Sequence, residues 1–505
     1  MKTILFLFLL IGLSKIQFAQ TNYWQKKFDH HLSTGEEGRS VLATDSGCII
    51  LFGTTDTIGF TNGLLKSGLL FLSDSGSIQL EKLYSYPNNY FFPGGYGTLI
   101  KVENKLLFAG SSQNQSNPGN AVLTKFDSFQ NIEWQQTYGD TNFQSGWKCQ
   151  QTRDKGFIII GQNGVDLSDS SDVLLIKTDS MGNFQWQKLI GGFSVETGLA
   201  IDTCIDGGYI LTCATLSYGV GAGSGFGNGY IVKTDILGNA QWSRTVGDIY
   251  DDGLWNGITL HDGTYLFCGY YSYFDPYYSQ GVCCNSESKL YLIHLDLNGS
   301  ILWERTYDRT RLNNQLYSVK ELPDGNLIAA GWFNDTLTSK VQGVLLKLNS
   351  NGDTIWSHKY DYFHGLHSVN IFNDVALMHD GGFVATGFIN PTYPDSSITG
   401  QDLWVVKVDS NGCEMANCLV NAIGEVVNKE NNLSVFPNPV SSVVNFQLDD
   451  VEDQIEKITL FNSMGQKIKF QNQTEINMNE YSTGIYFYLV YTRKKLIFSG
   501  KFIKQ

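Results

Sequence analysis

Residues 179–186 read Asp-Ser-Met-Gly-Asn-Phe-Gln-Trp, and the pattern in them, Asp-x-x-Gly-x-x-x-Trp, recurs along the chain. Six more copies, two of them clean and four degraded, keep the same spacing. They begin at Ser73, Asp127, Asp235, Asp296, Asn349 and Asp409. Consecutive copies lie about 50–60 residues apart, the period at which propeller blades repeat. The sequence therefore predicts a chain that folds by stacking seven copies of one unit.

One unit, within residues 199–242, indicates how each copy folds. Its expected strands are, in order, 199–204, 209–214, 230–234 and 240–246. Glycines in the two intervening turns, 206–208 and 235–238, tolerate positive φ. Four antiparallel strands in each of seven units make an all-β, seven-bladed β-propeller. The composition agrees, because 53 Gly and 67 aromatic residues (31 Phe, 26 Tyr and 10 Trp) favour short strands and tight turns.

The two ends of the repeat array predict how the ring closes. The seventh unit has a third strand at 403–408 and a turn at Asp409, but no tryptophan follows. Trp24 stands ahead of the first unit, in a Trp-Gln-Lys triplet that matches the one at Trp186. We therefore expect the propeller to span residues 20–412, with its N-terminal segment supplying the outer strand of the last blade. Closure of this kind removes two unpaired sheet edges.

The repeated Asp, Gly and Trp are interpreted as scaffold residues. An Asp at the head of a turn accepts backbone N–H groups, Gly takes the strained position, and Trp fills the wedge between blades. The tryptophans assigned this role are Trp24, Trp134, Trp186, Trp242, Trp303 and Trp356. The units resemble the docking repeats of quinoprotein-type propellers and the short bacterial repeats of the delta-60 kind, over residues 22–412. The resemblance implies a propeller scaffold.

Long insertions gather at one position in the units, between the second and third strands. They are residues 54–68, 111–120, 162–171, 215–229, 270–288, 332–342 and 388–401. The short turns fall on the opposite face, so the insertions form a long-loop face. Rigid aromatic rings on an exposed loop suit sugar or protein recognition. The candidate ligand-binding residues, all in the fifth insertion, are Tyr270, Tyr271, Tyr273, Phe274, Tyr277 and Tyr278. The alternative is that these rings pack on each other to hold a long loop.

The N-terminus and the charge limit the compartment and the partners. Lys2, the apolar run 4–13 and Ala19 predict a signal peptide over residues 1–19, too short to be a mature membrane anchor. No other stretch has the ~20 apolar residues that a transmembrane helix needs. The net charge is −14, which repels phosphate backbones, so nucleic acid is not an expected partner.

The nine cysteines lack the spacing of a zinc site. Cys204 faces Cys213 across an expected hairpin, and Cys413 and Cys418 are placed to close a small loop, so both pairs are candidate disulfides. Buried free thiols are expected at the three cysteines in strand-like runs, which are Cys48, Cys149 and Cys268.

The sequence predicts no catalytic residues, no metal and no cofactor. His364 and His367 lack a third ligand nearby, and neither a Gly-x-Ser-x-Gly elbow nor a phosphate loop occurs. The adjacent pair Cys283-Cys284 is similar to a pair that lies against the cofactor in quinoprotein alcohol dehydrogenases. Those enzymes have eight blades and a calcium-ligand set, and this sequence has neither.

Beyond a polar linker at residues 413–432, residues 433–505 contain short alternating strands typical of a compact β-sandwich. Four motifs in this tail, at residues 436–439, 460–466, 481–487 and 500–504, closely resemble the type A C-terminal sorting domain of the type IX secretion system of Bacteroidota. The residues that carry the sorting motif are Pro437, Asn438, Pro439, Gly465, Gly484, Tyr486 and Lys501.

This resemblance implies that the tail is a secretion signal. The type IX machinery carries such proteins across the outer membrane, after which the tail is removed and the body is released or attached to surface lipopolysaccharide. We therefore expect a secreted or cell-surface propeller that binds a glycan or protein through its long-loop face. The rival hypothesis is a secreted enzyme, either a hydrolase or a cofactor-dependent oxidoreductase, which carboxyl groups with perturbed pKa values converging on the central axis would favour.

Overall fold

The computed structural model divides the chain into two compact units, residues 1–414 and 415–505. It describes residues 23–29, 35–56, 64–85, 90–114, 117–139, 142–166, 170–220, 222, 227–273, 287–307, 313–335, 340–363, 368–391, 400–414, 433–448, 454–462, 467–471, 473–493 and 497–505. All regular elements in these ranges are strands. Within them, no helix is long and apolar enough to cross a membrane.

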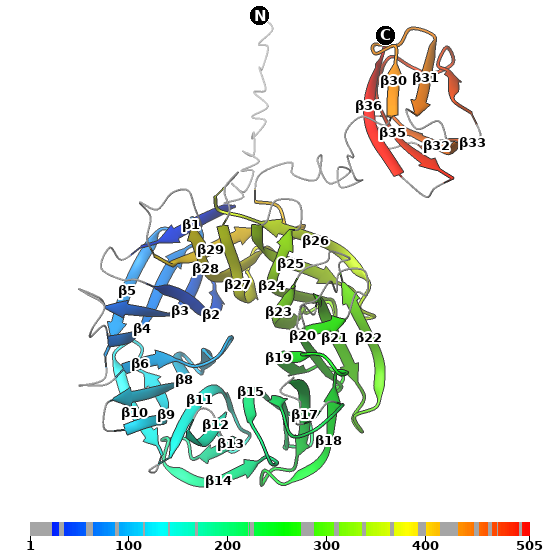
Figure 1. The fold of residues 1–505 in the computed structure, drawn as a ribbon. Coiled ribbons are helices and arrows are strands. Elements are labelled where there is room, and N and C mark those ends of the chain that lie inside the picture. The colour runs from blue at the N-terminus through cyan, green and yellow to red at the C-terminus, as the bar shows by residue number, and fades with distance from the viewer. Residues whose placement is uncertain are drawn as a thin grey trace, which may run out of the picture. The chain divides into compact units, whose positions relative to one another are not determined.

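The first unit is a ring of seven blades around a central opening (Figure 1). Blade 1 contains β2 (Glu36–Thr44), β3 (Gly47–Asp56), β4 (Leu64–Ser73) and β5 (Ile78–Tyr84). Blade 2 contains β6 (Tyr90–Pro93), β7 (Ile100–Val102), β8 (Lys105–Asn114), β9 (Asn117–Phe126) and β10 (Ile132–Tyr138). Blade 3 contains β11 (Phe143–Gln151), β12 (Phe157–Asp166), β13 (Ser170–Thr178) and β14 (Phe184–Ile190). Blade 4 contains β15 (Glu196–Thr203), β16 (Tyr209–Thr215), β17 (Asn228–Thr234) and β18 (Ala240–Val246).

The remaining blades repeat the same order. Blade 5 contains β19 (Gly253–Thr259), β20 (Tyr265–Tyr273), β21 (Glu287–Leu295) and β22 (Ile301–Tyr307). Blade 6 contains β23 (Gln315–Glu321), β24 (Leu327–Asp335), β25 (Lys340–Leu348) and β26 (Thr354–Tyr360). Blade 7 contains β27 (Ser368–Leu377), β28 (Phe383–Pro391), β29 (Asp402–Val408) and, from the N-terminus, β1 (Trp24–Phe28). The prediction of an all-β, seven-bladed propeller followed by a small β domain is confirmed.

The hydrophobic core lies between neighbouring blades. Between blades 3 and 4, for example, Ile160 and Leu175 of one sheet pack with Leu211 and Val232 of the next. The third strand of a blade is buried on both faces, as in β17, whereas the outer strand β18 is largely exposed. Each fully buried aliphatic side chain contributes about 1.5–3 kcal/mol, so the ring is stabilised at the seams between its sheets.

The N-terminal strand closes the ring. β1 pairs antiparallel with β29, with Trp24 opposite Lys407 and Phe28 opposite Leu403. The indole Nε1 of Trp24 also donates a hydrogen bond to the carbonyl of Asp74, at 2.8 Å, in the outer turn of blade 1. The first strand in the sequence therefore completes blade 7 and contacts blade 1.

Each repeat Trp packs on the turn Gly of the following blade. The pairs are Trp24 with Gly76, Trp134 with Gly182, Trp186 with Gly238, Trp242 with Gly299, Trp303 with Gly352, and Trp356 with Gly412. A Cβ atom on any of these glycines would lie within about 3 Å of the indole, and all six have φ between 70° and 79°. The Asp at the head of the turn accepts backbone hydrogen bonds, as Asp179 does from Met181 and Asn183 at 2.8 Å.

The contact between blades 1 and 2 lacks both the Trp and the Gly of this pairing. Blade 1 has Leu80 where the other outer strands have Trp, and the turn of blade 2 has Gln130, with φ 57°, where the others have Gly. Lys82 of blade 1 donates to the carbonyl of Phe129 at 2.7 Å and to the Oδ1 of Asn131 at 3.0 Å. The Trp and the Gly are thus lost together, because a smaller side chain leaves room for a Cβ in the turn.

The two kinds of short turn lie on one face, the turn face. In blade 3, Lys177 at the end of β13 bonds Asp154 in the turn between β11 and β12, at 2.8 Å. Lys233 and Asp206 repeat this contact in blade 4 at 2.7 Å. The opposite, long-loop face carries the insertions, and many of their residues fall outside the described ranges.

The second unit contains two small sheets. One has the order β30 (Leu433–Phe436), β31 (Val443–Leu448) and β34 (Glu475–Asn477). The other has the order β33 (Lys467–Gln471), β32 (Ile455–Phe461), β35 (Gly484–Thr492) and β36 (Ile497–Lys504). Phe446, Ile458, Tyr486 and Phe502 are among the residues of its own hydrophobic core.

Candidate functional site

The inner strands that line the central opening share a β-bulge. In β2, β11, β15, β19, β23 and β27, one residue near the middle of the strand is skipped in the pairing with the second strand. The skipped residues are Arg39, Trp147, Leu199, Trp255, Tyr317 and Asn373. A bulge re-aims a side chain and is typical of barrel rims and active sites. Two of the skipped side chains, Leu199 and Asn373, are buried, and the other four are half-buried.

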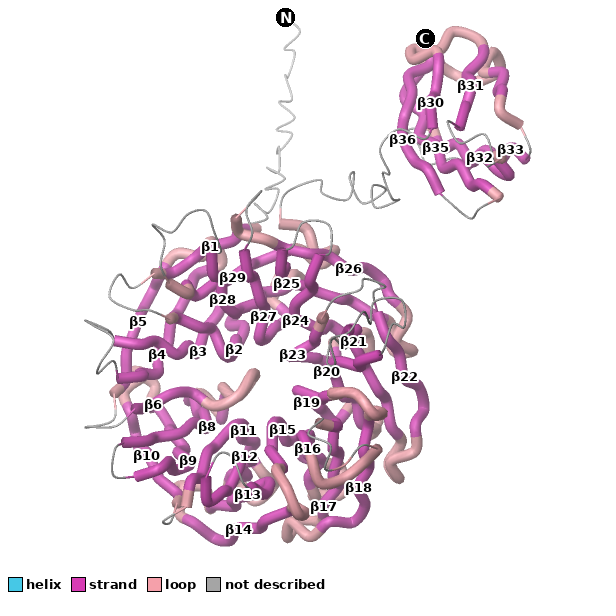
Figure 2. The backbone as a smooth tube through the Cα atoms, viewed as in Figure 1, coloured by secondary structure: helices cyan, strands magenta, loops and turns pink. Residues whose placement is uncertain are grey.

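Blade 2 replaces the bulge with a longer loop. Residues 94–99 separate β6 from β7, although both strands pair with β8. Figure 2 shows the loop of this blade reaching into the central opening. Gly95 N donates to the carbonyl of Trp147 in blade 3 at 2.6 Å, and Gly97 N donates to that of Arg39 in blade 1 at 3.0 Å. The loop is thus held by both neighbouring blades.

Tyr96, at the tip of this loop, gathers an aromatic cluster from across the ring. Its ring stacks on Tyr317 of blade 6 with centroids 4.6 Å apart, and lies 6.1 Å from Trp255 of blade 5. Tyr317 and Trp255 meet edge to face at 5.2 Å. The Arg39 guanidinium of blade 1 lies over Tyr96 at 5.5 Å and pairs with Glu37 at 2.8 Å. We call these five residues the channel cluster.

Hydrogen bonds fix the orientation of the cluster. Trp255 Nε1 donates to Gln315 Oε1 at 3.1 Å, and Trp332 Nε1 donates to the Tyr317 hydroxyl at 3.0 Å. All five members of the cluster are half-buried, so none of them is fully enclosed by the protein. Burial raises the pKa of Tyr96 and Tyr317, which keeps both hydroxyls protonated. Rigid aromatic faces beside a guanidinium, a carboxylate and a carboxamide are chemically suited to hold a polar, flat-faced ligand such as a sugar.

Closer to the turn face, the same inner strands carry an axial polar layer. It consists of Lys148, Asp202, Asn256, Lys320 and Asp374. Lys148 Nζ donates to Asn256 Oδ1 at 2.9 Å across blade 4, and Lys320 pairs with Asp374 at 3.3 Å. Burial, with Lys320 nearby, lowers the pKa of Lys148 to about 8. Burial raises the pKa of Asp202 despite hydrogen bonds from backbone N–H groups.

Of the six aromatic residues predicted to bind a ligand, three lie in the described part of the chain and three lie outside it. Tyr270, Tyr271 and Tyr273 end strand β20, and Phe274, Tyr277 and Tyr278 lie outside the described residues. The three described hydroxyls donate to carboxylates, Tyr270 to Asp251 at 3.1 Å, Tyr271 to Asp248 at 3.2 Å and Tyr273 to Glu287 at 2.7 Å. Lys289 also covers the Tyr273 ring at 4.0 Å.

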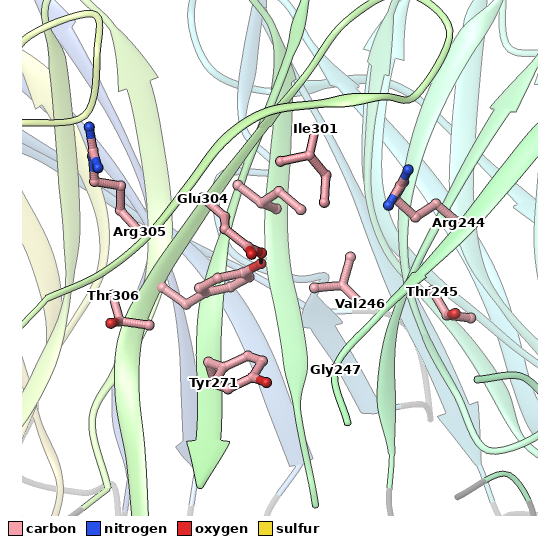
Figure 3. A pocket seen from close by; sticks show the side chains of 11 residues that line it. Arg244, Thr245, Val246, Gly247, Tyr271, Ile301, Glu304, Arg305 and Thr306 are labelled. Carbon is pink, nitrogen blue, oxygen red and sulfur yellow. Dashed lines mark hydrogen bonds between the residues drawn. The ribbon is translucent and has the colours of Figure 1, made fainter. Parts of the chain in front are cut away.

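Tyr271 borders a pocket on the outer side of the ring (Figure 3). The pocket has a volume of about 520 Å³ and lies between β18 and the strands β21 and β22. Its Glu304 accepts a hydrogen bond from Tyr291 at 2.8 Å. Arg244 Nε donates to the carbonyl of Gly299 at 2.8 Å, and Arg305, which points away from the Glu304 carboxylate in Figure 3, pairs with Asp353 at 3.3 Å. The pocket therefore lacks a convergent set of polar groups.

The cysteine predictions have mixed outcomes. Cys204 and Cys213 are buried free thiols, so the disulfide expected between them is wrong. Cys48, Cys149 and Cys268 are buried free thiols as expected. Cys413 is disulfide-bonded, and its expected partner Cys418 lies outside the described residues, as do Cys283, Cys284, His364 and His367. No group of three or more His, Cys, Asp or Glu side chains in the described ranges is arranged to hold a metal ion.

In the second unit, the first sorting motif lies against the last strand. Asn438 Oδ1 accepts a hydrogen bond from Ile503 N at 2.9 Å, and Val440 N, just past Pro437 and Pro439, donates to the Ile503 carbonyl at 2.7 Å. The ring of Tyr486 is buried and stacks on Phe502. Lys501 is exposed, Gly484 begins β35, and Gly465 lies outside the described residues.

Comparison with known proteins identifies the second unit. Residues 434–505 match the family described as the secretion system C-terminal sorting domain. This match indicates export through type IX secretion to the cell surface or the extracellular space. None of the curated proteins compared with the chain matches it.

Several solved structures are similar at low identity. PorZ, a surface component of the type-IX secretion system of Porphyromonas gingivalis, is 10% identical, covering 92% of this chain and 70% of its own, with a TM-score of 0.33. A polysaccharide lyase, ulvan lyase, is 8% identical over 79% of this chain and 99% of its own, with a TM-score of 0.46. An α-L-arabinanase of Penicillium chrysogenum is 11% identical over 76% of this chain and 95% of its own, with a TM-score of 0.37.

Proposed function

We propose that this exported propeller binds a glycan on its long-loop face, at the channel cluster. The observation that carries the proposal is the convergence of Tyr96, Trp255 and Tyr317 from three blades, with ring centroids 4.6–6.1 Å apart. Inner strands run from the long-loop face to the turn face. The strand residues of the cluster lie in the first half of β2, β19 and β23, and they are Glu37, Arg39, Trp255 and Tyr317. The cluster therefore belongs to the long-loop end of the channel.

The choice of a glycan follows from the chemistry of the cluster. Sugars present apolar C–H faces ringed by hydroxyls, which match aromatic rings flanked by hydrogen-bonding groups. Arg39, Glu37 and Gln315 supply charged and amide groups at the edges of the rings. A protein ligand, the other class expected from the sequence, would need a larger apolar surface than three half-buried rings.

A glycan-array screen of the purified full-length protein tests the proposal, followed by titration of the best ligand. Tyr96→Ala should weaken binding about ten-fold or more, because a central aromatic anchor contributes more than ~1 kcal/mol. Phe129→Ala is the matched control, since this ring is 75% exposed on the turn face. Tyr273→Ala tests the segment first expected to bind. Equal loss in all three variants, or no glycan bound by the parent protein, rejects the proposal.

A hydrolase is the second candidate, and the observation that favours it is Asp202. Burial raises the pKa of this carboxyl, and it lies on the channel axis with Lys148 nearby. Asp374, the other carboxylate of the layer, is paired with Lys320 and accepts from the Ser318 hydroxyl at 2.7 Å. The test is an assay for reducing ends released from polysaccharides. Release by the parent protein that is lost in Asp202→Asn would establish hydrolase activity. If no substrate is cleaved, the hydrolase candidate is rejected and glycan binding stays as the proposal.

A further inference from the structure

The axial polar layer contains a buried hydrogen-bond donor, Asn256 Nδ2, that has no acceptor in the described structure. Asn256 is 1% exposed, and its Nδ2 has no hydrogen-bond partner among the residues that the structure describes. The side chain cannot be turned over to satisfy that atom, because a lysine ammonium only donates and Asn256 Oδ1 must face Lys148 Nζ. Nδ2 is therefore held as a buried, unpaired N–H donor beside a buried ammonium.

Lys148 has no ion pair with a carboxylate in the described part of the chain, although Asp202 and Asp374 lie near enough to favour its charged form. Its ammonium is 4% exposed, and among the described residues its hydrogen-bond acceptor is the neutral Asn256. Burying a charge is costly unless it is paired, and the cost shows in the lowered pKa of Lys148. Within the described residues, Asn256 Nδ2 thus lacks an acceptor and Lys148 lacks a directly bonded carboxylate.

The two carboxylates of the layer are occupied elsewhere. Asp374 pairs with Lys320 and accepts hydrogen bonds from Ser318 Oγ at 2.7 Å and Val41 N at 3.0 Å. Asp202 accepts from the backbone N–H groups of Thr203 at 2.8 Å and Thr259 at 2.9 Å. Neither carboxylate has a hydrogen bond to Lys148 in the described structure.

The layer is partly exposed toward the turn end of the channel. Lys320 and Asp202 lie at the ends of β23 and β15, next to the short turns. Lys320 is 35% exposed, while Lys148 and Asn256 lie one layer further in. From the long-loop side, the loop of residues 94–99 reaches down to the layer, where a Cβ on Gly97 would lie 3.5 Å from Lys320 Nζ and 3.6 Å from Asp374 Oδ1. A small ligand would therefore enter from the turn face, apart from the channel cluster.

We propose that Lys148, Asn256 Nδ2 and Lys320 form a binding site for an oxyanion group, a sulfate, phosphate or carboxylate, inside the turn end of the propeller channel. The group is either a free inorganic ion or an acidic substituent on a sugar. It would supply an acceptor for Asn256 Nδ2 and a directly bonded anionic partner for Lys148. This site is separate from the proposed glycan site, so either can fail without the other.

Asn256→Asp is the sharpest test variant. It is nearly isosteric, gives Lys148 a permanent carboxylate partner, and replaces the unpaired donor with an oxygen that repels anions. Lys148→Met removes the charge in a second way, and Lys188→Met, an exposed lysine of β14, is the matched control. Melting temperatures of all variants first establish that they fold.

Calorimetric titration of the purified full-length protein with sodium sulfate, sodium phosphate and sodium glucuronate, at ionic strength matched with chloride, reads out the site. Saturable binding is expected for the parent and Lys188→Met, with at least a ten-fold loss in Asn256→Asp and Lys148→Met. Tighter binding of glucuronate assigns the group to an acidic sugar, and tighter binding of sulfate or phosphate assigns it to a free ion. Absence of saturable binding by the parent, or equal binding by Asn256→Asp, overturns the proposal.

Protonation gives an independent signature. An anion beside Lys148 favours the ammonium form, so binding near pH 8 takes up protons. The apparent binding enthalpy should therefore differ between buffers of different ionisation enthalpy, and that difference should vanish in Lys148→Met. Binding without proton uptake would place the anion elsewhere.

Discussion

At the scale of single residues, the repeat signature is a contact between two blades. The Trp of one blade lies on the turn Gly of the next, so the signature Gly is required for its missing Cβ as well as for its positive φ. The loss of both residues together at the Leu80 and Gln130 seam supports this reading. The sequence alone predicted that Trp fills a wedge between blades, but the partner became visible only in three dimensions.

Two glycines allow the steric and the backbone-conformational costs of a Gly→Ala substitution to be measured separately. Gly238 has φ 77° and a built Cβ would lie 2.8 Å from the Trp186 ring, whereas Gly325 has φ 78° and nothing within 4 Å. Both alanine variants incur the positive-φ cost of about 1–2 kcal/mol, and Gly238→Ala should lose about 1–3 kcal/mol more because it overpacks the seam. Urea unfolding of the two variants measures the difference. Equal destabilisation would show that the contact with Trp186 is relaxed without cost.

The lowered pKa of Lys148 predicts that the free energy of unfolding depends on pH. Its pKa of about 8 in the folded protein lies below the ~10.4 of an unfolded lysine. Between these values the unfolded state binds more protons, so the free energy of unfolding rises with pH. Relative to Lys148→Met, the parent should gain up to roughly 3 kcal/mol from pH 8 to pH 10.5. Denaturation curves at matched pH check this, with Lys188→Met as a flat reference; a constant difference between parent and Lys148→Met contradicts it.

At the scale of elements, the strands were predictable and the bulges were not. Alternating apolar residues between Gly-containing turns place strands such as 240–246 at their observed bounds. A bulge adds one residue without changing composition, so Trp255 and Tyr317 read as ordinary inner-strand residues. The one visible signal was the run Pro93-Gly94-Gly95, which interrupts the first strand of blade 2 rather than its loop. The aromatic residues of the insertion at 270–288 were the stronger sequence signal for a ligand site.

Strand β1 gives a prediction at this scale. Its removal exposes the edge of β29, which is buried along its whole length, and leaves Gly76 without Trp24. Deleting residues 23–28 should therefore lower the melting temperature and promote aggregation through the open edge. A synthetic peptide spanning residues 23–29 should restore the melting temperature, and the same peptide with Trp24→Ala should restore less. A deletion variant that melts like the parent would mean that the other strands hold the ring closed.

At the scale of the whole molecule, the two units carry separate information. The core of the C-terminal unit consists of its own residues, including Val444, Ile458 and Tyr486. The sorting tail was recognisable from sequence because its motifs are short, ordered and specific. The ligand of the propeller was not, because its proposed sites are assembled from residues far apart in the chain, such as Tyr96 and Tyr317.

This separation predicts that export and folding can be uncoupled. Removing residues 433–505 should retain the protein in the periplasm of a host with type IX secretion, because the sorting domain is what the machinery handles. The melting transition of the remaining propeller should match that of the parent, because each unit has its own hydrophobic core. Fractionation with an antibody against the propeller, together with calorimetry of the retained protein, measures both outcomes.

A second variant distinguishes the loss of the sorting domain from its misfolding. Tyr486→Ala keeps the tail in the sequence but removes a buried ring that stacks on Phe502, which should cost the C-terminal unit about 3–5 kcal/mol. If the machinery reads a folded domain, this variant is retained like the truncation, whereas Ile485→Ser, at a side chain that is 44% exposed on the same strand, is exported. Export of Tyr486→Ala at the parental level would instead mean that the motif is read as an extended sequence, and export of the truncated chain would place the secretion signal in the propeller.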